Sequence, residues 1–268
     1  MPNNINTEKL VITALITAMT AVMTIAVAIP VPFTNGYVHP GDSMILLGAL
    51  ILGRRRGAFA AGVGSALADI IIGYSVWAPF TLVIKGVMAF ITGLIIEKCE
   101  EKRRNLAVLC GSVIALWLVF NAAVFGVVMY TANTDAASLS SILGAEGNAS
   151  SLAAAVRGIE ARLMASALII PAALLLIAFA LRKKENVSVP LSHVVGMTGG
   201  GLFMVFGYYI AGSLIYGNIA AAVFSIPANI AQFVGGFLIA ALLSAALRNT
   251  SAKRYFLHSA EDFRRRGR

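Results

Sequence analysis

The chain alternates between long apolar runs and short polar stretches. Most of the apolar runs approach or exceed the roughly 20 residues that a helix needs to cross a bilayer. Apolar and polar residues do not alternate within runs such as 107–119, which argues against a membrane β-barrel. The pattern therefore predicts an all-α, polytopic bundle of membrane helices built from the apolar segments 9–29, 44–53, 57–72, 78–96, 106–130, 161–181, 193–215 and 219–247.

The second segment, 44–53, is too short to span a membrane alone. Its ten residues would reach only about 15 Å as a helix, whereas the hydrocarbon core is about 30 Å thick. Either it is extended by Pro40, Gly41 and Asp42, with Asp42 as its N-cap, or it forms a re-entrant hairpin with the third segment. In both cases we expect the chain to return to the external side at 73–77.

Composition supports the membrane assignment. The chain is 59% hydrophobic and 12% charged, whereas soluble domains carry about 25% charged residues. The net charge of +9 could suggest a nucleic-acid partner, but the basic residues cluster at the ends of the apolar runs, as membrane anchors do. With the N-terminus inside, all basic residues except Lys85, Arg157 and Arg162 fall on the cytoplasmic side. We therefore expect a multi-pass membrane protein with both termini cytoplasmic and no nucleic acid as partner.

Two ionisable residues, Asp69 and Lys85, lie within apolar segments. Such residues are costly in a membrane and by default mark a functional site. Each shares its helix face with small residues, which allow close packing, so both charges should point into the outer half of the bundle. An ion pair between Asp69 and Lys85 is one interpretation, and contact with a solute is the other; they are compatible.

The last segment carries Pro227, Asn229 and Gln232. Proline can bend a helix, and the two amides are i, i+3 neighbours. They could form interhelical hydrogen bonds, or they could read the edge of a heteroaromatic ring, because each offers a donor and an acceptor.

Aromatic and polar residues in the outer connections are open to two interpretations. Trp77 lies between Asp69 and Lys85 in the sequence. It could belong to the interfacial aromatic belt or to the wall of a small-molecule pocket. His39 and Asp42 precede the second segment; a structural role near a turn competes with a role in a loop that covers a site.

The first segment contains the pair Ala14 and Ala18, four residues apart. Small residues at this spacing serve ordinary helix packing or the docking of another membrane subunit. No chemistry-bearing motif accompanies these features. The glycine-rich stretch 196–201 lacks the Lys-Ser/Thr of a phosphate-binding loop, and no residues have metal-ligand spacing. We therefore expect neither cofactor, metal, nor enzymatic activity.

Taken together, several stretches resemble one family. They are residues 37–86 (YVHPGDSMILLGALILGRRRGAFAAGVGSALADIIIGYSVWAPFTLVIKG), the pair Ala14 and Ala18, and residues 226–232 (IPANIAQ). They resemble the S components, or substrate-binding subunits, of energy-coupling factor (ECF) vitamin transporters. The nearest branch is the riboflavin type, which includes hydroxymethylpyrimidine and pyridoxine carriers. The resemblance covers about two thirds of the chain.

The resemblance implies a core of six helices, to which this chain adds two. We accordingly divide the chain into residues 1–104, with the first four core helices; 105–184, an inserted helical hairpin with an external loop; and 185–268, with the last two core helices and a basic cytoplasmic tail. An insertion with an even number of spans leaves the topology of the core unchanged.

The resemblance also implies a function. An S component captures a vitamin from outside and delivers it by toppling on a transmembrane coupling subunit driven by two ATPase subunits. The ligand would be a small heteroaromatic such as riboflavin, pyridoxine or hydroxymethylpyrimidine. Alternatives are a stand-alone secondary carrier or channel, and a membrane scaffold protein. On the S-component interpretation, the coupling subunit docks at Ala14 and Ala18, and the substrate-binding residues are Asp69, Trp77, Lys85, Asn229 and Gln232, with His39 and Asp42 in a covering loop.

Overall fold

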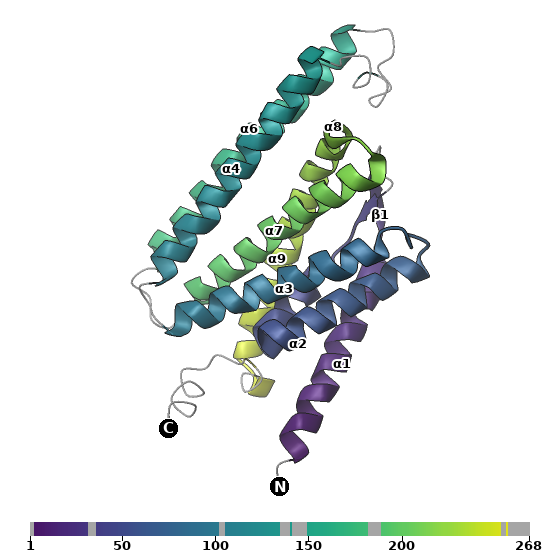
Figure 1. The fold of residues 1–268 in the computed structure, drawn as a ribbon. Helices are drawn as coiled ribbons and strands as arrows, with labels where there is room; N and C mark the ends of the chain where they lie inside the picture. The colour runs from purple at the N-terminus through teal and green to yellow at the C-terminus, as the bar shows by residue number, and fades with distance from the viewer. Residues whose placement is uncertain are drawn as a thin grey trace.

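The computed structural model describes residues 3–31, 36–101, 105–134, 140, 149–181, 189–252 and 256. These residues form an all-α bundle with one small β-ribbon, which confirms the predicted fold class (Figure 1). The elements are α1 (Asn3–Ala26), β1 (Ile29–Val31), β2 (Gly36–Val38), α2 (Asp42–Ile71), α3 (Ala78–Glu101), α4 (Asn105–Thr134), α6 (Ala149–Leu181), α7 (Leu191–Tyr216), α8 (Ile219–Ala222), the 3₁₀ turn η1 (Val223–Ser225) and α9 (Ile226–Arg248).

The surface of the bundle is apolar. Within the described residues, six helical spans are long and hydrophobic enough to cross a membrane: Thr7–Ala26, Ala78–Cys99, Leu106–Thr134, Ala153–Leu181, Leu191–Tyr216 and Ile219–Arg248. Large apolar side chains such as Leu168 and Phe179 are 72% and 77% exposed. Apolar surface on this scale is unusual in soluble monomers and is what lipid contact requires, so the chain is a multi-pass membrane protein.

Helix α2 is a tight hairpin rather than a straight rod. Gly53 interrupts it with φ 73° and ψ −177°, and a Cβ added to Gly57 would lie 3.0 Å from the Cα of Ala49. Residues eight positions apart in a straight helix are separated by about 12 Å, so the chain folds back at Gly53. This fits the predicted hairpin of segments 44–53 and 57–72, although Arg54, Arg55 and Arg56 are helical rather than a loop.

The short first arm of this hairpin is completely sheltered. Residues 41–50 are all buried, which explains how an arm shorter than a membrane span is tolerated. The predicted small-residue faces are confirmed as packing surfaces: Ala61, Ser65 and Asp69 are buried in α2, and Thr81, Lys85 and Ala89 are buried in α3. At the contact between these helices, a Cβ on Gly62 would come within 2.6 Å of the Leu82 carbonyl oxygen.

The last apolar segment was predicted as one continuous helix, but the structure shows that it is not. It is divided into α8, η1 and α9. Asn218 caps α8 by accepting hydrogen bonds from the backbone N–H groups of Ala220 and Ala221. Pro227 lies in the first turn of α9, where its missing N–H costs nothing. The expected mid-helix bend is therefore a helix start.

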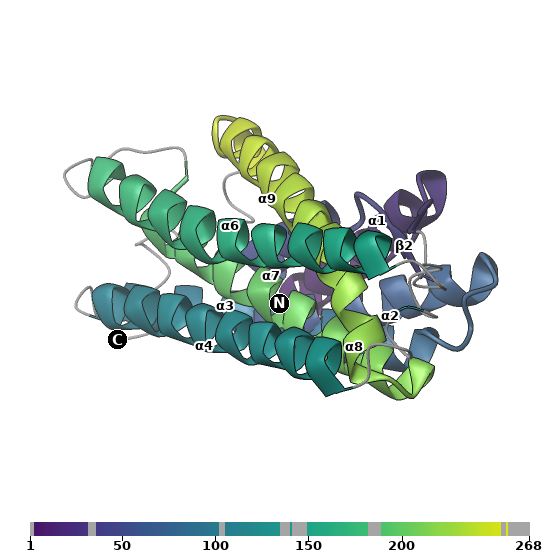
Figure 2. The same cartoon turned by 90° about the horizontal axis from the view of Figure 1, so that it is seen from above.

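Helices α4 and α6 pack against each other as a hairpin. The Trp117 indole N–H donates to the Ser166 carbonyl oxygen at 3.1 Å, and the Ser166 hydroxyl donates to Asn121 Oδ1 at 3.0 Å. The pair packs on α7, where the Phe120 and Phe206 rings meet edge to face. Figures 1 and 2 place α4 and α6 on one flank of the bundle and α1 on another.

The external loop predicted between these two helices is shorter than expected. Helix α4 continues to Thr134, and α6 already begins at Ala149. Most of residues 135–148 lie outside the described part of the chain. Residues 182–188 and most of the C-terminal tail lie outside it as well.

We predict that Gly53→Ala lowers the free energy of unfolding by about 1–3 kcal/mol, because this combination of φ and ψ is almost exclusive to glycine. Thermal unfolding in detergent measures the change. Gly111→Ala is the matched control, since a Cβ at Gly111 in α4 meets no atom within 4 Å. Equal shifts of the two unfolding midpoints would contradict the assigned role of Gly53.

Candidate ligand pocket at one end of the bundle

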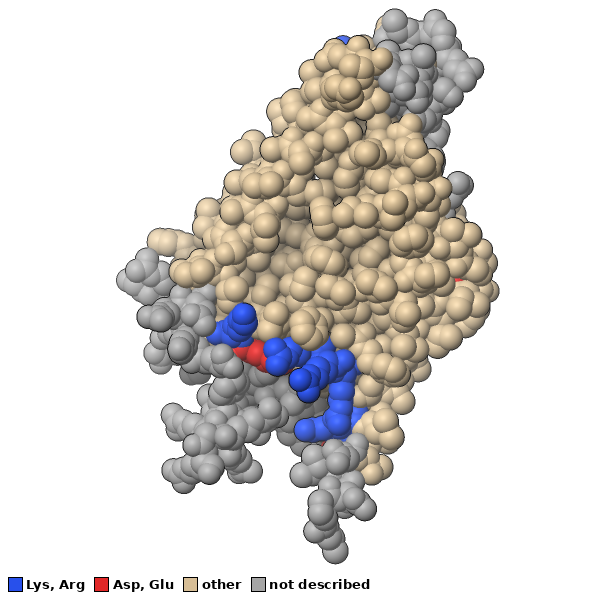
Figure 3. Space-filling model, viewed as in Figure 1, with Lys and Arg blue, Asp and Glu red and all other residues tan. Residues whose placement is uncertain are grey.

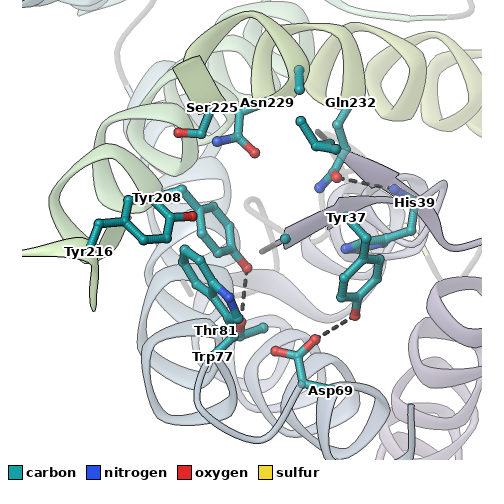
Figure 4. A pocket seen from close by; sticks show the side chains of 13 residues that line it. Tyr37, His39, Asp69, Trp77, Thr81, Tyr208, Tyr216, Ser225, Asn229 and Gln232 are labelled. Atoms are coloured by element: carbon teal, nitrogen blue, oxygen red, sulfur yellow. Dashed lines mark hydrogen bonds between the residues drawn. The ribbon is translucent and has the colours of Figure 1, made fainter. Parts of the chain in front are cut away.

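A pocket opens at the end of the bundle opposite the Arg54–Arg56 turn, among the β-ribbon, α2, α3, α7 and α9 (Figure 4). It holds about 500 Å³ of empty space, counting the part open to solvent. Its lining consists mainly of aromatic and uncharged polar residues: Val31, Gly36, Tyr37, His39, Asp69, Trp77, Thr81, Tyr208, Tyr216, Ser225, Ala228, Asn229 and Gln232.

The β-ribbon brings part of the connection between α1 and α2 to the pocket. Strands β1 and β2 pair in antiparallel register, with Pro30 opposite Tyr37. Val31, Gly36, Tyr37 and His39 from this region line the pocket. The expectation that His39 belongs to a covering segment agrees with this position.

A buried ion pair lies behind the pocket wall. Lys85 Nζ donates to Asp42 Oδ1, and both side chains are fully buried. The interpretation that Lys85 forms its ion pair with Asp69 is therefore wrong. The reason is the α2 hairpin, which returns the start of the helix to the same end as its finish. Asp42 is also not in a covering loop, because it is the first residue of α2.

Further contacts tie this ion pair to three other elements. Gln232 Nε2 of α9 donates to Asp42 Oδ2 at 3.0 Å, and the backbone N–H of His39 donates to Gln232 Oε1 at 3.1 Å. Lys85 Nζ also lies 5.1 Å from the centre of the Tyr208 ring of α7. Gln232 thus makes the interhelical hydrogen bonds that were one of its two predicted roles, while also lining the pocket.

His39 is held as a neutral ring. Its Nδ1 accepts a hydrogen bond from the backbone N–H of Gly41 at 3.1 Å. Burial lowers the pKa of His39 to about 3; the positive charge of Lys85 acts in the same direction, and the charge of Asp42 opposes it. The imidazole therefore carries no charge at physiological pH.

Asp69 lines the pocket, with one carboxyl oxygen hydrogen-bonded and the other buried. The Tyr37 hydroxyl donates to Asp69 Oδ1. No hydrogen-bond partner for Oδ2 is found among the described residues, although Asp69 is only 3% exposed. Thr81 lies close to this carboxyl group, and its hydroxyl oxygen is 3.1 Å from that of Tyr208.

Aromatic rings form the opposite wall. The Trp77 ring lies 5.9 Å from that of Tyr208 and 6.1 Å from that of Tyr216. Trp77 is 9% exposed and lines the pocket, which favours the pocket-wall interpretation over the interfacial belt. Sequence reasoning missed Tyr208 and Ser225. The available signal for Tyr208 was a hydroxyl group within an otherwise apolar segment.

The predicted site residues therefore divide into three groups. His39, Asp69, Trp77, Asn229 and Gln232 line the pocket, and Figure 4 shows the Asn229 amide directed into it. Asp42 and Lys85 lie behind the wall. Ala14 and Ala18 are elsewhere, on the exposed face of α1. Among the described residues, no group of three or more His, Cys, Asp or Glu side chains could hold a metal.

We predict that Lys85→Met and Asp42→Asn each lower the free energy of unfolding by about 3–5 kcal/mol, because each leaves a buried group without its partner. The double variant should lose clearly less than the sum. Chemical or thermal unfolding in detergent measures the free energies for this double-mutant cycle. The control cycle pairs Lys85→Met with Asp69→Asn and should be closer to additive; stronger coupling there would instead support the Asp69–Lys85 pair.

Comparison with known proteins identifies a family for the chain. The family model described as "ECF-type riboflavin transporter, S component" matches residues 4–164 and 164–249. A protein of Pyrococcus woesei described as "Uncharacterized protein in gap 3'region" is 56% identical over 72 residues, which are 27% of this chain and 48% of that protein.

The chain thus spans about half the length of this curated relative. No solved structure matches the chain. The family match, in contrast, extends from α1 to α9. The chain belongs to the family of S components of ECF-type riboflavin transporters.

Proposed function

We propose that this chain is the substrate-binding membrane subunit of an ECF-type importer. It captures a small heteroaromatic vitamin or vitamin precursor from outside and delivers it by toppling on an ATP-driven coupling module. The observation that carries the proposal is the pocket itself: an aromatic-walled cavity with a few convergent polar groups, at one end of an apolar bundle. Such a lining suits a flat ring with polar edges.

The distribution of charge supports a pocket that faces the exterior. Figure 3 shows Lys and Arg side chains gathered along one end of the molecule. Arg54 and Glu97 form an ion pair at that end, with Arg54 Nε 3.2 Å from Glu97 Oε2. By the positive-inside rule this end is cytoplasmic. The pocket, at the other end of α2 and α3, then opens to the outside.

Helix α1 offers the surface for the coupling subunit. Ala14 and Ala18 are exposed, and Val11, Leu15 and Val22 beside them are 61%, 55% and 61% exposed. The opposite face, with Thr13 and Thr20, is buried in the bundle. The inserted pair α4 and α6 lies on a different flank (Figure 2). The insertion therefore leaves the α1 face open to a coupling subunit, which two ATPase subunits would energise.

We predict that ligand binding quenches or shifts the fluorescence of Trp77 and leaves that of Trp117 unchanged. The chain has two tryptophans: Trp77 lines the pocket, and Trp117 lies in the α4–α6 contact. Purified Trp117→Phe should respond to its vitamin, and the matched variant Trp77→Phe should not. Mass spectrometry of the small molecule that co-purifies identifies the ligand.

Uptake assays separate this proposal from its alternatives. Liposomes with this chain alone should bind the ligand without accumulating it, whereas liposomes that also contain the coupling module should accumulate it with ATP. Accumulation by the chain alone would favour a secondary carrier or channel. Absence of any bound small molecule would remove the proposed function.

We predict that Ala14→Leu combined with Ala18→Leu abolishes ATP-dependent uptake and co-purification of the coupling subunit, while the ligand affinity changes less than about threefold. Larger side chains would separate two closely packed helices, and both positions are remote from the pocket. Ala122→Leu, at an exposed position of α4, is the control and should leave assembly intact. Loss of ligand binding in the double variant would contradict a pure docking role.

A further inference from the structure

The charge in and behind the pocket does not balance. Lys85 and Asp42 neutralise each other, and the remaining oxygen of Asp42 is occupied by Gln232. His39 is neutral, as its acceptor role at Nδ1 requires. Asp69 therefore adds a second carboxyl group near Lys85, whose ion pair is with Asp42.

The position of Asp69 makes this imbalance consequential. Its side chain is almost completely removed from solvent, and Oδ2 has no hydrogen-bond partner among the described residues. The Tyr37 hydroxyl donates to Oδ1, and the Thr81 hydroxyl lies beside the same carboxyl group. A buried carboxylate without an ion-pair partner of its own is expensive, so a positive group that reaches it from the pocket gains an ion pair and relieves that cost.

The walls of the pocket suit a positive charge as well. Tyr37, Trp77, Tyr208 and Tyr216 surround the space next to Asp69 (Figure 4). Aromatic faces attract cations through their quadrupoles, and several faces around one site are a recurrent way to bind organic cations. The described lining contains no Lys or Arg, so an anionic group would meet a carboxylate and no compensating charge.

We propose that this pocket selects a positively charged planar heteroaromatic ring and rejects anionic ones. The ring stacks between the aromatic walls, and its cationic or N–H-bearing edge is directed to Asp69 Oδ2. This inference rests on the proposed function and narrows its substrate class. Phosphorylated or carboxylated forms of a vitamin are excluded, and a neutral ring binds more weakly than a cationic ring of the same shape.

The test uses ligands that share a ring and differ in charge. Affinities of the purified protein for 1-methylnicotinamide (cation), nicotinamide (neutral) and nicotinate (anion) are compared with those for thiamin, a larger heteroaromatic cation, and for riboflavin and its 5′-phosphate. Trp77 fluorescence in the Trp117→Phe background is the readout. The cations should bind at least tenfold more tightly than their neutral counterparts, and the anions should not bind measurably.

Asp69→Asn removes the charge with almost no change of shape. It should weaken binding of the cations at least tenfold and change the affinity for neutral ligands less than about threefold. Glu97→Gln is the matched control, because it removes a carboxylate at the opposite, basic end, and it should leave the ranking unchanged. If Asp69→Asn does not fold, the ranking of ligands by the wild-type protein decides alone.

Several results would overturn the inference. They are a neutral or anionic ligand as the tightest binder, an unchanged affinity for cations in Asp69→Asn, or no binding of any cation in the panel. A neutral or anionic vitamin that co-purifies with the protein would refute the cation preference and uphold the proposed function. Absence of any bound or co-purifying small molecule would refute both.

Discussion

The ion pair between Lys85 and Asp42 is the interaction on which the outer half of the bundle depends. It joins the start of α2 to α3, and through Gln232 and the His39 backbone it extends to α9 and to the β-ribbon. Neither charge has access to water, so each requires the other to be tolerated at all. The elements that line the pocket are thus held in place by one polar cluster that the ligand itself need not touch.

That cluster can form only because α2 reverses direction. Gly53 adopts a backbone conformation that is almost exclusive to glycine. The small residues near it let the two arms of the hairpin approach closely. At the other side, Gly236 brings α9 against the start of α2, where a Cβ would lie 2.7 Å from the Asp42 Cβ. The close approach of the two α2 arms and of α9 therefore determines where Asp42 and Lys85 meet.

Much of this arrangement could be predicted from the sequence, and the failures have physical causes. Hydrophobic runs and four-residue spacing of small residues located the helices and the buried faces of Asp69 and Lys85, because both depend on local periodicity. The partner of Lys85 could not be predicted in this way. Sequence proximity favoured Asp69, whereas the hairpin brings in Asp42 from 43 residues away. Tyr208 was missed because a tyrosine in an apolar helix has no distinctive spacing.

The length of helices α4 and α6 has a mechanical consequence. At 30 and 33 residues, α4 and α6 extend about 45 and 50 Å, well beyond a hydrocarbon layer of about 30 Å. Such hydrophobic mismatch is accommodated by tilt or by projection into water. A subunit that rotates within the bilayer would move these projecting helix ends through the membrane interface. The Phe120–Phe206 contact between α4 and α7 is one of the contacts through which such a movement would pass between this pair and the rest of the bundle.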